Sequence, residues 1–344
     1  MLPRRFRPVA ALALVALAGL ASSLAGARAA SAQEPVVMKI ATAAPAGTPW
    51  DALLKEYKKN VETRSAGRLK VKIQLGAGDE NDTVQRVKNG QLQAAGATTG
   101  ALASQVPELS VVEIPFLFHS FDEADDVIDH LLGPALEPIV REDGLVLGFW
   151  SESGFRHFAT RDGFVKVPAD LKGKKMRCQE SQMHLEMYKN LGGSPVPVPT
   201  TEVLTALKNG TVEGFDQALV YMIAAGWYTT IKYVTLSSHI YQPSLVVFNK
   251  AWFDGLPADL QAILLEEGRA IQARGRTQVR GLAKKQLKTL TDAGVQLYQL
   301  TDPERDAFEK ATAPARLSFR KTTGKRAARL LDDAEARLAK SRLP

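Results

Sequence analysis

Two arginines lie in short apolar runs that have the character of buried strands. Arg156 stands in GFRHFAT and Arg177 in KMRC. A guanidinium carries a rigid fork of donors that fits a carboxylate with two parallel hydrogen bonds. Arginine is seldom fully buried unless it is paired. Because neither run contains an acid, the sequence predicts that an external anion pairs with these side chains.

A structural role stays open for both arginines. Arg177 is the stronger candidate for binding a ligand carboxylate, and its alternative is a salt bridge between two lobes. For Arg156, a place in a ligand cleft competes with structural pairing to an acid.

Further candidates for ligand contact stand at the ends of predicted strands and helices, where α/β proteins gather binding residues. Several have a structural alternative: helix packing for Trp50, ordinary core packing for Trp227, an N-terminal dipole role for Glu80 and sheet-edge capping for Thr98. Asp216, in the same stretch as Gln217, has the capping of the next helix as its alternative. The remaining candidates are Gln217, Thr200 and Tyr221.

The pattern of reactive residues argues against an enzyme or a metal protein. The five histidines show no HxxxH or similar spacing, and no GxSxG, P-loop or GxGxxG motif occurs. Cys178 is the only cysteine, so no intrachain disulfide can form. We expect no metal and no cofactor. A hydrolase that uses Cys178 with His157 or His184 is kept as a rival hypothesis.

The elements that must position these residues alternate between strand and helix. Apolar spacing predicts strands over 36–42, 69–75 and 145–150, with a helix that begins at Thr48-Pro49. Ser120 to Glu123 forms a capping box that opens another helix. The segments QRVKNGQLQAAG (85–96) and TALKNGTVEGFD (205–216) echo one another as helix end, Asn-Gly stop and strand. The pattern predicts α/β layers with mostly parallel strands, and a helix over 259–293 long enough to lie across two lobes.

The first 32 residues are typical of a Sec-type secretory signal peptide. Arg4, Arg5 and Arg7 precede an Ala/Leu-rich apolar run, and Ala30-Ser31-Ala32 is a small-residue cleavage site. An uncleaved membrane anchor is the alternative, but the apolar run is short for a span. The formal charge of +7 includes four arginines of this segment, so the rest of the chain carries about +3. With no basic stripe that interleaves aromatics, we expect no nucleic acid partner.

Several stretches together resemble the periplasmic solute-binding proteins of TRAP transporters, of the DctP type. They are ATAAPAGTPWDALLKEYKKNVETRSAGRLKVKI, VPELSVVEIPFLFHSFDEADDV, GFRHFATRDGFVKVPADLKGKKMRCQES, LGGSPVPVPTTEVLTALKNGTVEGFDQ and FNKAWFDGLPADLQ. The resemblance extends over nearly the whole chain after the signal peptide. The resemblance implies two α/β lobes, joined by crossing strands and a long helix, that close on a ligand.

The resemblance also implies roles for individual residues. Arg177 falls on the arginine that makes a two-pronged salt bridge to a ligand carboxylate, and Arg156 lies beside it. Gln217 takes a position that is often asparagine, and Thr200 one that is often aromatic, which leaves ligand size and polarity open.

We therefore expect a two-lobe periplasmic-binding-protein architecture. Residues 33–153 and about 243–282 form lobe I, and residues 154–242 and about 283–344 form lobe II. The expected function is a periplasmic receptor, monomeric, that captures a small carboxylate and delivers it to small and large TRAP permease subunits. The alternative to transport is a receptor that presents its ligand to a sensor kinase.

Overall fold

The computed structural model describes residues 34–342, so the predicted signal peptide lies outside the described residues. Its strands are β1 (Val36–Thr42), β2 (Leu69–Leu75), β3 (Ala94–Thr98), β4 (Leu145–Thr160), β5 (Lys175–Cys178), β6 (Ser194–Pro197), β7 (Gly214–Ala218), β8 (Tyr233–Asn249) and β9 (Gln296–Gln299). Its helices are α2 (Pro49–Arg64), α3 (Glu80–Lys88), α4 (Thr99–Leu102), α5 (Phe121–Val127), α6 (Gly133–Glu142), α7 (Gln182–Asn190), α8 (Val203–Lys208), α9 (Leu219–Ala224), α10 (Lys250–Asp254), α11 (Ala258–Gly281), α12 (Ala283–Asp292), α13 (Asp302–Thr322) and α14 (Lys325–Ser341). Four short helical turns complete the set, namely η1 (Pro107–Glu113), η2 (Ile128–Leu132), η3 (Pro168–Leu171) and η4 (Trp227–Thr230).

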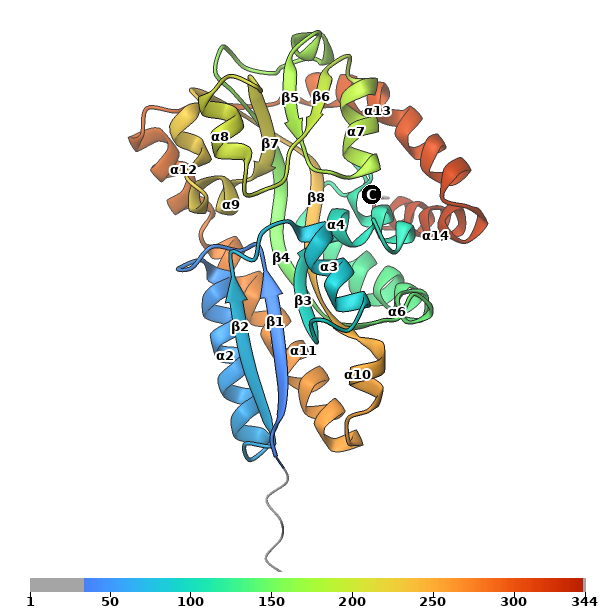
Figure 1. Ribbon diagram of the computed structural model, residues 1–344. Coiled ribbons are helices and arrows are strands. Elements are labelled where there is room, and N and C mark those ends of the chain that lie inside the picture. Colours follow the sequence, from blue (N-terminus) through green and yellow to red (C-terminus); the bar gives the residue numbers. More distant parts are fainter. Residues whose placement is uncertain (1–33, 343–344) are drawn as a thin grey trace, which may run out of the picture. The chain divides into compact units, whose positions relative to one another are not determined.

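The nine strands form one continuous mixed sheet in the order β2-β1-β3-β8-β4-β7-β5-β6, with β9 paired to β8 (Figure 1). The outer strands pair in parallel, as β1 does with β3 and β5 with β6 and β7. The long strands β4 and β8 run antiparallel to one another. β4 is also antiparallel to β7, and β8 to β3. Of β4, the sequence predicted two separate short pieces, 145–150 and the GFRHFAT run that contains Arg156. Gly154, at φ +95°, begins the second piece.

β4 and β8 carry the chain between two groups of strands (Figure 1). β8 pairs with β3 over Ser244–Phe248 and with β9 over Tyr233–Leu236. β4 pairs with β7 over Arg156–Thr160. We call the sheet with β1, β2 and β3 the first half, and the sheet with β5, β6, β7 and β9 the second half.

The exact lobe limits stay a prediction. α14 packs against α5, η1 and η2, and its Leu331 belongs to the same apolar core as Val127 and Leu132. Those elements fall in lobe I of the predicted division, which placed the end of the chain in lobe II.

Local sequence explains where several elements begin. The Thr48 side chain accepts a hydrogen bond from the Asp51 amide with Pro49 at the first helical position, and Ser120 accepts one from the Glu123 amide. The predicted helix over 259–293 is divided at Leu282 into α11 and α12. Gly281 stands at this junction, and glycine is a poor helix former.

The echo between 85–96 and 205–216 corresponds to a repeated local structure. α3 leads through Gly90 to β3 and α4, and α8 leads through Gly210 to β7 and α9. Both glycines adopt positive φ, +76° and +77°, which L side chains rarely adopt. Within residues 34–342, no helix has both the length and the apolar character needed to cross a bilayer.

Candidate functional site

Arg177 is held in place on β5 but keeps one unpaired amino group. Its side chain is 1% exposed, and Nε and Nη2 both donate to the Val198 carbonyl, at 3.0 and 2.8 Å. The guanidinium carbon lies 5.3 Å from the ring centre of Trp227, a cation–π contact. Nη1 is buried and has no hydrogen-bond partner among the described residues. A fixed cation with a free donor is suited to an anion that enters from outside.

Arg177 lines a small cavity at the start of α3. Asn81, Glu80, Gln179 and Thr200 share the lining with it, together with Asp79, Ala101 and Glu180. Asn81 Oδ1 is also buried without a partner in the described part of the chain. The pKa of Arg177 is lowered by burial and then by repulsion from Arg156. An anion bound here would favour the charged guanidinium and so oppose this lowering of the pKa.

Arg156, in contrast, has its partners inside the protein. Its Nε donates to Asp216 Oδ2 at 2.5 Å, Nη1 donates to Gln217 and Gln242 side-chain oxygens, and Nη2 donates to the Asp216 carbonyl. Both ion-pair side chains are fully buried. Of the two roles that the sequence left open for Arg156, the structure contains the pairing with an acid. Asp216 does not cap a helix.

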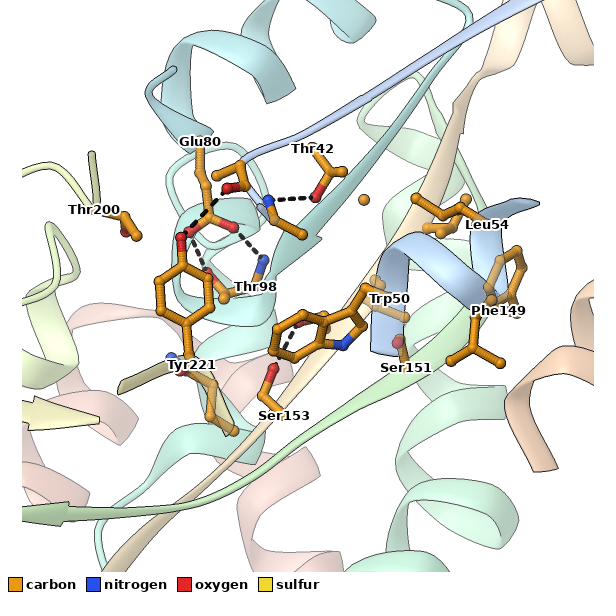
Figure 2. A pocket seen from close by; sticks show the side chains of 18 of the residues that line it. Thr42, Trp50, Leu54, Glu80, Thr98, Phe149, Ser151, Ser153, Thr200 and Tyr221 are labelled. Atoms are coloured by element: carbon orange, nitrogen blue, oxygen red, sulfur yellow. Dashed lines mark hydrogen bonds between the residues drawn. The ribbon is translucent and has the colours of Figure 1, made fainter. Parts of the chain in front are cut away.

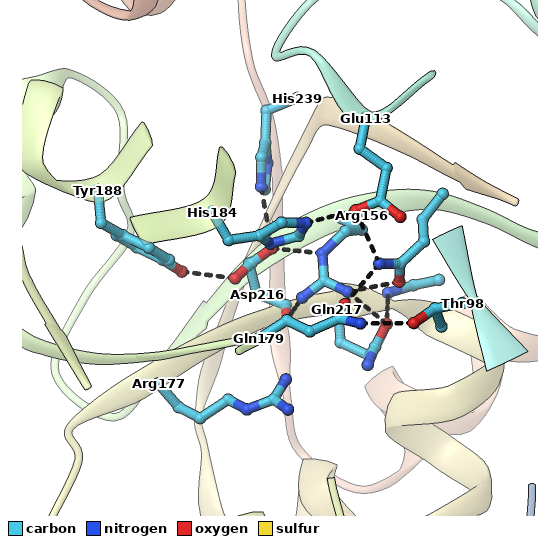
Figure 3. A network of polar contacts seen from close by, with 12 residues as sticks. Thr98, Glu113, Arg156, Arg177, Gln179, His184, Tyr188, Asp216, Gln217 and His239 are labelled. Carbon is cyan, nitrogen blue, oxygen red and sulfur yellow. Dashed lines mark hydrogen bonds and ion pairs between the residues drawn. The ribbon is translucent and has the colours of Figure 1, made fainter. Parts of the chain in front are cut away.

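Asp216 is the centre of a buried polar cluster (Figure 3). Tyr188 donates to Oδ1 at 2.8 Å, and His239 lies 3.3 Å from Oδ2. Burial alone would raise the pKa of Asp216, but Arg156 and His239 outweigh it and hold this pKa well below its usual value. The cluster therefore contains a stable carboxylate anion.

A chain of hydrogen bonds links this cluster to the first half of the sheet (Figure 3). Gln242, bonded to Arg156, donates to Gln179 at 2.6 Å, and Gln179 donates to Thr98 Oγ1 at 2.5 Å. Thr98 in turn donates to Glu80 through both its amide and its hydroxyl, at 3.0 and 3.1 Å. Arg156 therefore holds Gln217 and Gln242 in position, but it lines neither the small cavity nor the larger one described next.

A larger cavity adjoins the small one and shares Glu80, Gln179 and Thr200 with it (Figure 2). The space within it that the centre of a water-sized sphere can occupy is about 60 Å³. Predicted residues from both halves line it, namely Trp50, Glu80, Thr98, Thr200, Gln217 and Tyr221. Burial raises the pKa of Glu80, while the hydrogen bonds from Thr98 oppose that shift.

Trp227 lies behind the site and not in the lining. It is 1% exposed and packs against Phe215 and Tyr221 as well as Arg177. Sequence reasoning missed Asn81, Gln179 and Gln242. Gln179 had a signal, because it follows Arg177 by two positions and side chains in an extended chain alternate between faces.

The surroundings of Cys178 do not suit a nucleophile. The thiol is buried, and burial raises its pKa to about 12. His157 has a pKa lowered to about 3 by burial and His239, and His184 is bonded to Glu113 at 2.6 Å. A nucleophilic cysteine requires a thiolate, which this environment opposes.

Comparisons with known proteins give one consistent family. The family model for bacterial extracellular solute-binding protein, family 7 (DctP), matches residues 40–322. A solute-binding protein of Verminephrobacter eiseniae is 35% identical over 285 residues, which cover 81% of this chain and 83% of that one.

Two solved structures are similar over almost their whole length. The sugar acid binding protein DctPAm of Advenella mimigardefordensis, in complex with galactonate, has a TM-score of 0.84 at 27% identity, covering 88% of this chain and 99% of that chain. A TRAP periplasmic solute-binding protein of Polaromonas sp. JS666, bound to D-erythronate, has a TM-score of 0.82 at 26% identity, covering 88% and 98%. The chain belongs to the DctP family, family 7 of the bacterial extracellular solute-binding proteins.

Proposed function

We propose that this protein is an extracytoplasmic receptor that captures a small organic acid and delivers it to a TRAP-type secondary transporter. The observation that carries the proposal is the buried Arg177 with its unpaired Nη1. A carboxylate at that donor neutralises a cation that the described residues leave without an acid. Galactonate and D-erythronate, bound by the two similar proteins, are both carboxylates.

The proposal assigns the ligand to the space between the two halves of the sheet. Arg177, Thr200, Gln217 and Tyr221 would contact it from the second half, and Glu80, Thr98 and Trp50 from the first. Arg156 and Trp227 would hold Gln217 and Arg177 in position. The predicted signal peptide supports a periplasmic location, and family membership supports small and large permease subunits as partners.

A ligand screen tests the role of Arg177. The purified protein is melted with a library of organic acids, and the acids that raise its melting temperature are titrated by calorimetry. Arg177→Ala leaves the ligand charge unpaired, at a cost of about 2–5 kcal/mol, so affinity falls by more than about tenfold. Arg177→Lys also weakens binding, because an ammonium lacks the planar fork.

Arg329→Ala is the matched control, because this arginine is 85% exposed and its contact with Asp333 is 3.8 Å. It should bind as the wild type does. Wild-type affinity in both Arg177 variants would refute the role of Arg177 in binding the carboxylate. If only neutral compounds raised the melting temperature, the assignment of an anionic ligand would be refuted.

A further inference from the structure

The larger cavity has a polar end and an apolar wall (Figure 2). Glu80, Thr98 and Thr200 lie at the end next to Arg177. The opposite wall lies beyond Trp50 and is made by aliphatic and aromatic side chains from α2, β4, β8 and α11. They are Leu53, Leu54, Phe149, Val246 and Ile271. A molecule that fills both ends must therefore be polar at one end and apolar at the other.

Most polar groups along the wall are already bonded to the protein. Trp50 Nε1 donates to the Glu152 carbonyl at 3.0 Å, and Thr42 Oγ1 accepts from the Ala44 amide at 3.2 Å. The hydroxyls of Ser153 and Ser244 bond to one another at 3.1 Å. A ligand with several hydroxyls would find few partners here, and buried hydroxyls without partners oppose binding.

Charge gives a second restriction on the ligand. Arg177 is the only lysine or arginine in the described lining of the two cavities. Glu80 adds a carboxyl group to the shared lining. A second ligand carboxylate at the apolar wall would be buried without a cation, which is strongly unfavourable.

We propose that the ligand is a monocarboxylate with an apolar aliphatic or aromatic body. Its carboxylate lies at Arg177, and its body runs past Trp50 to Leu54 and Phe149. This inference rests on the proposed function and narrows it, because it excludes dicarboxylates and polyhydroxylated acids as the best ligands. Galactonate and D-erythronate, found in the similar proteins, belong to the second of these groups.

Gly96 offers a way to shorten the apolar space without disturbing the sheet. It lines the larger cavity on β3, in register with Thr42 of β1 and Val246 of β8. A Cβ at this position would lie 3.7 Å from Thr42 and 3.8 Å from Val246, which are ordinary contacts. Gly96→Ala therefore fits, and Gly96→Val, a residue that suits strands, fills more of the cavity.

The test compares four acids by calorimetry on the wild-type protein: hexanoate, phenylacetate, galactonate and succinate. The expected result is that hexanoate or phenylacetate binds at least tenfold more tightly than the other two. Binding should also show a negative heat-capacity change, which marks apolar burial. Gly96→Val should weaken hexanoate and phenylacetate by at least tenfold, and Gly96→Ala by less. Gly281→Ala is the control, because no atom lies within 4 Å of the added Cβ.

The possible results separate the inference from the proposed function. If galactonate or succinate binds best, and Arg177→Ala abolishes that binding, the inference is overturned and the receptor function stands. If no acid binds in a way that depends on Arg177, both are overturned. Hexanoate binding that is equal in wild type, Gly96→Ala and Gly96→Val would overturn the placement of the apolar body. The milder alanine variant keeps the test decisive if the valine variant fails to fold.

Discussion

Two buried arginines of this chain differ in how their charge is balanced, and the difference is measurable. Asp216→Asn removes the carboxylate beside Arg156 and leaves a buried cation without its counter-ion. Breaking one side of a buried pair costs about 3–5 kcal/mol of the free energy of unfolding. Urea denaturation at pH 7 measures this loss. Asp333→Asn makes the same chemical change in an exposed pair with Arg329 and should cost at most about 1 kcal/mol.

The pH dependence of that loss follows from the depressed pKa of Asp216. An acid whose pKa is lower in the folded state stabilises the protein above its unfolded value, which is 3.8 for aspartate. That stabilisation disappears as the pH falls through the lower, folded value. The difference between wild type and Asp216→Asn should therefore be constant from pH 5 to 8 and shrink below pH 3.8. A difference that is already lost at pH 6 would contradict the assignment.

At the residue scale, sequence predicted the candidates better than their roles. Arg177, Thr200, Gln217 and Glu80 do gather around adjoining cavities. The run around Arg156 did not reveal Asp216, because the two meet only through the pairing of β4 with β7. Asn81 and Gln242 had no local signal, since a polar residue at a helix start or in a strand is ordinary on its own.

At the element scale, signals within one turn or strand were reliable and signals over longer spans were not. Thr48, Ser120 and the two Asn-Gly stops marked real boundaries. The full lengths of β4 and β8 were not predicted, because their continuation depends on pairing with each other. The break between α11 and α12 was not predicted either, because the helical spacing of apolar residues continues on both sides of Leu282.

Helix α11 depends on one glycine where it packs against β4. A Cβ at Gly268 would lie 2.6 Å from Phe149 Cδ1, which is closer than real Cβ contacts. Gly268→Ala should therefore lower the free energy of unfolding by about 1–3 kcal/mol through overpacking, although alanine is the better helix former. Gly281→Ala, in the same helix and with open space around it, should be neutral or stabilising by up to about 1 kcal/mol. Urea denaturation of the two variants measures both changes. If Gly268→Ala stabilised the protein as much as Gly281→Ala, Phe149 would have moved aside and the overpacking argument would be wrong.

At the scale of the whole molecule, the larger cavity is lined by residues from both halves of the sheet. Tyr221 from α9 donates to the Ala43 carbonyl after β1 at 3.3 Å, and its ring lies 5.9 Å from Trp50 of α2. Gln179 after β5 bonds to Thr98 at the end of β3. The halves also share an apolar cluster of Ala44, Trp50, Ala218 and Val220, while the connection through β4 and β8 is continuous. Such an arrangement suits two halves that separate without ligand and close with it.

A ligand that touches both walls binds the closed conformer better and increases its population. X-ray scattering should therefore give a smaller radius of gyration when the tightest acid found by calorimetry is present at saturation. Arg177→Ala, at the same acid concentration, should give the curve of the free protein, because it loses the carboxylate contact and not the hinge. Arg329→Ala should close as the wild type does. If the saturated wild type scatters like the free protein, the halves do not move on binding, and the receptor would have to signal occupancy without closure.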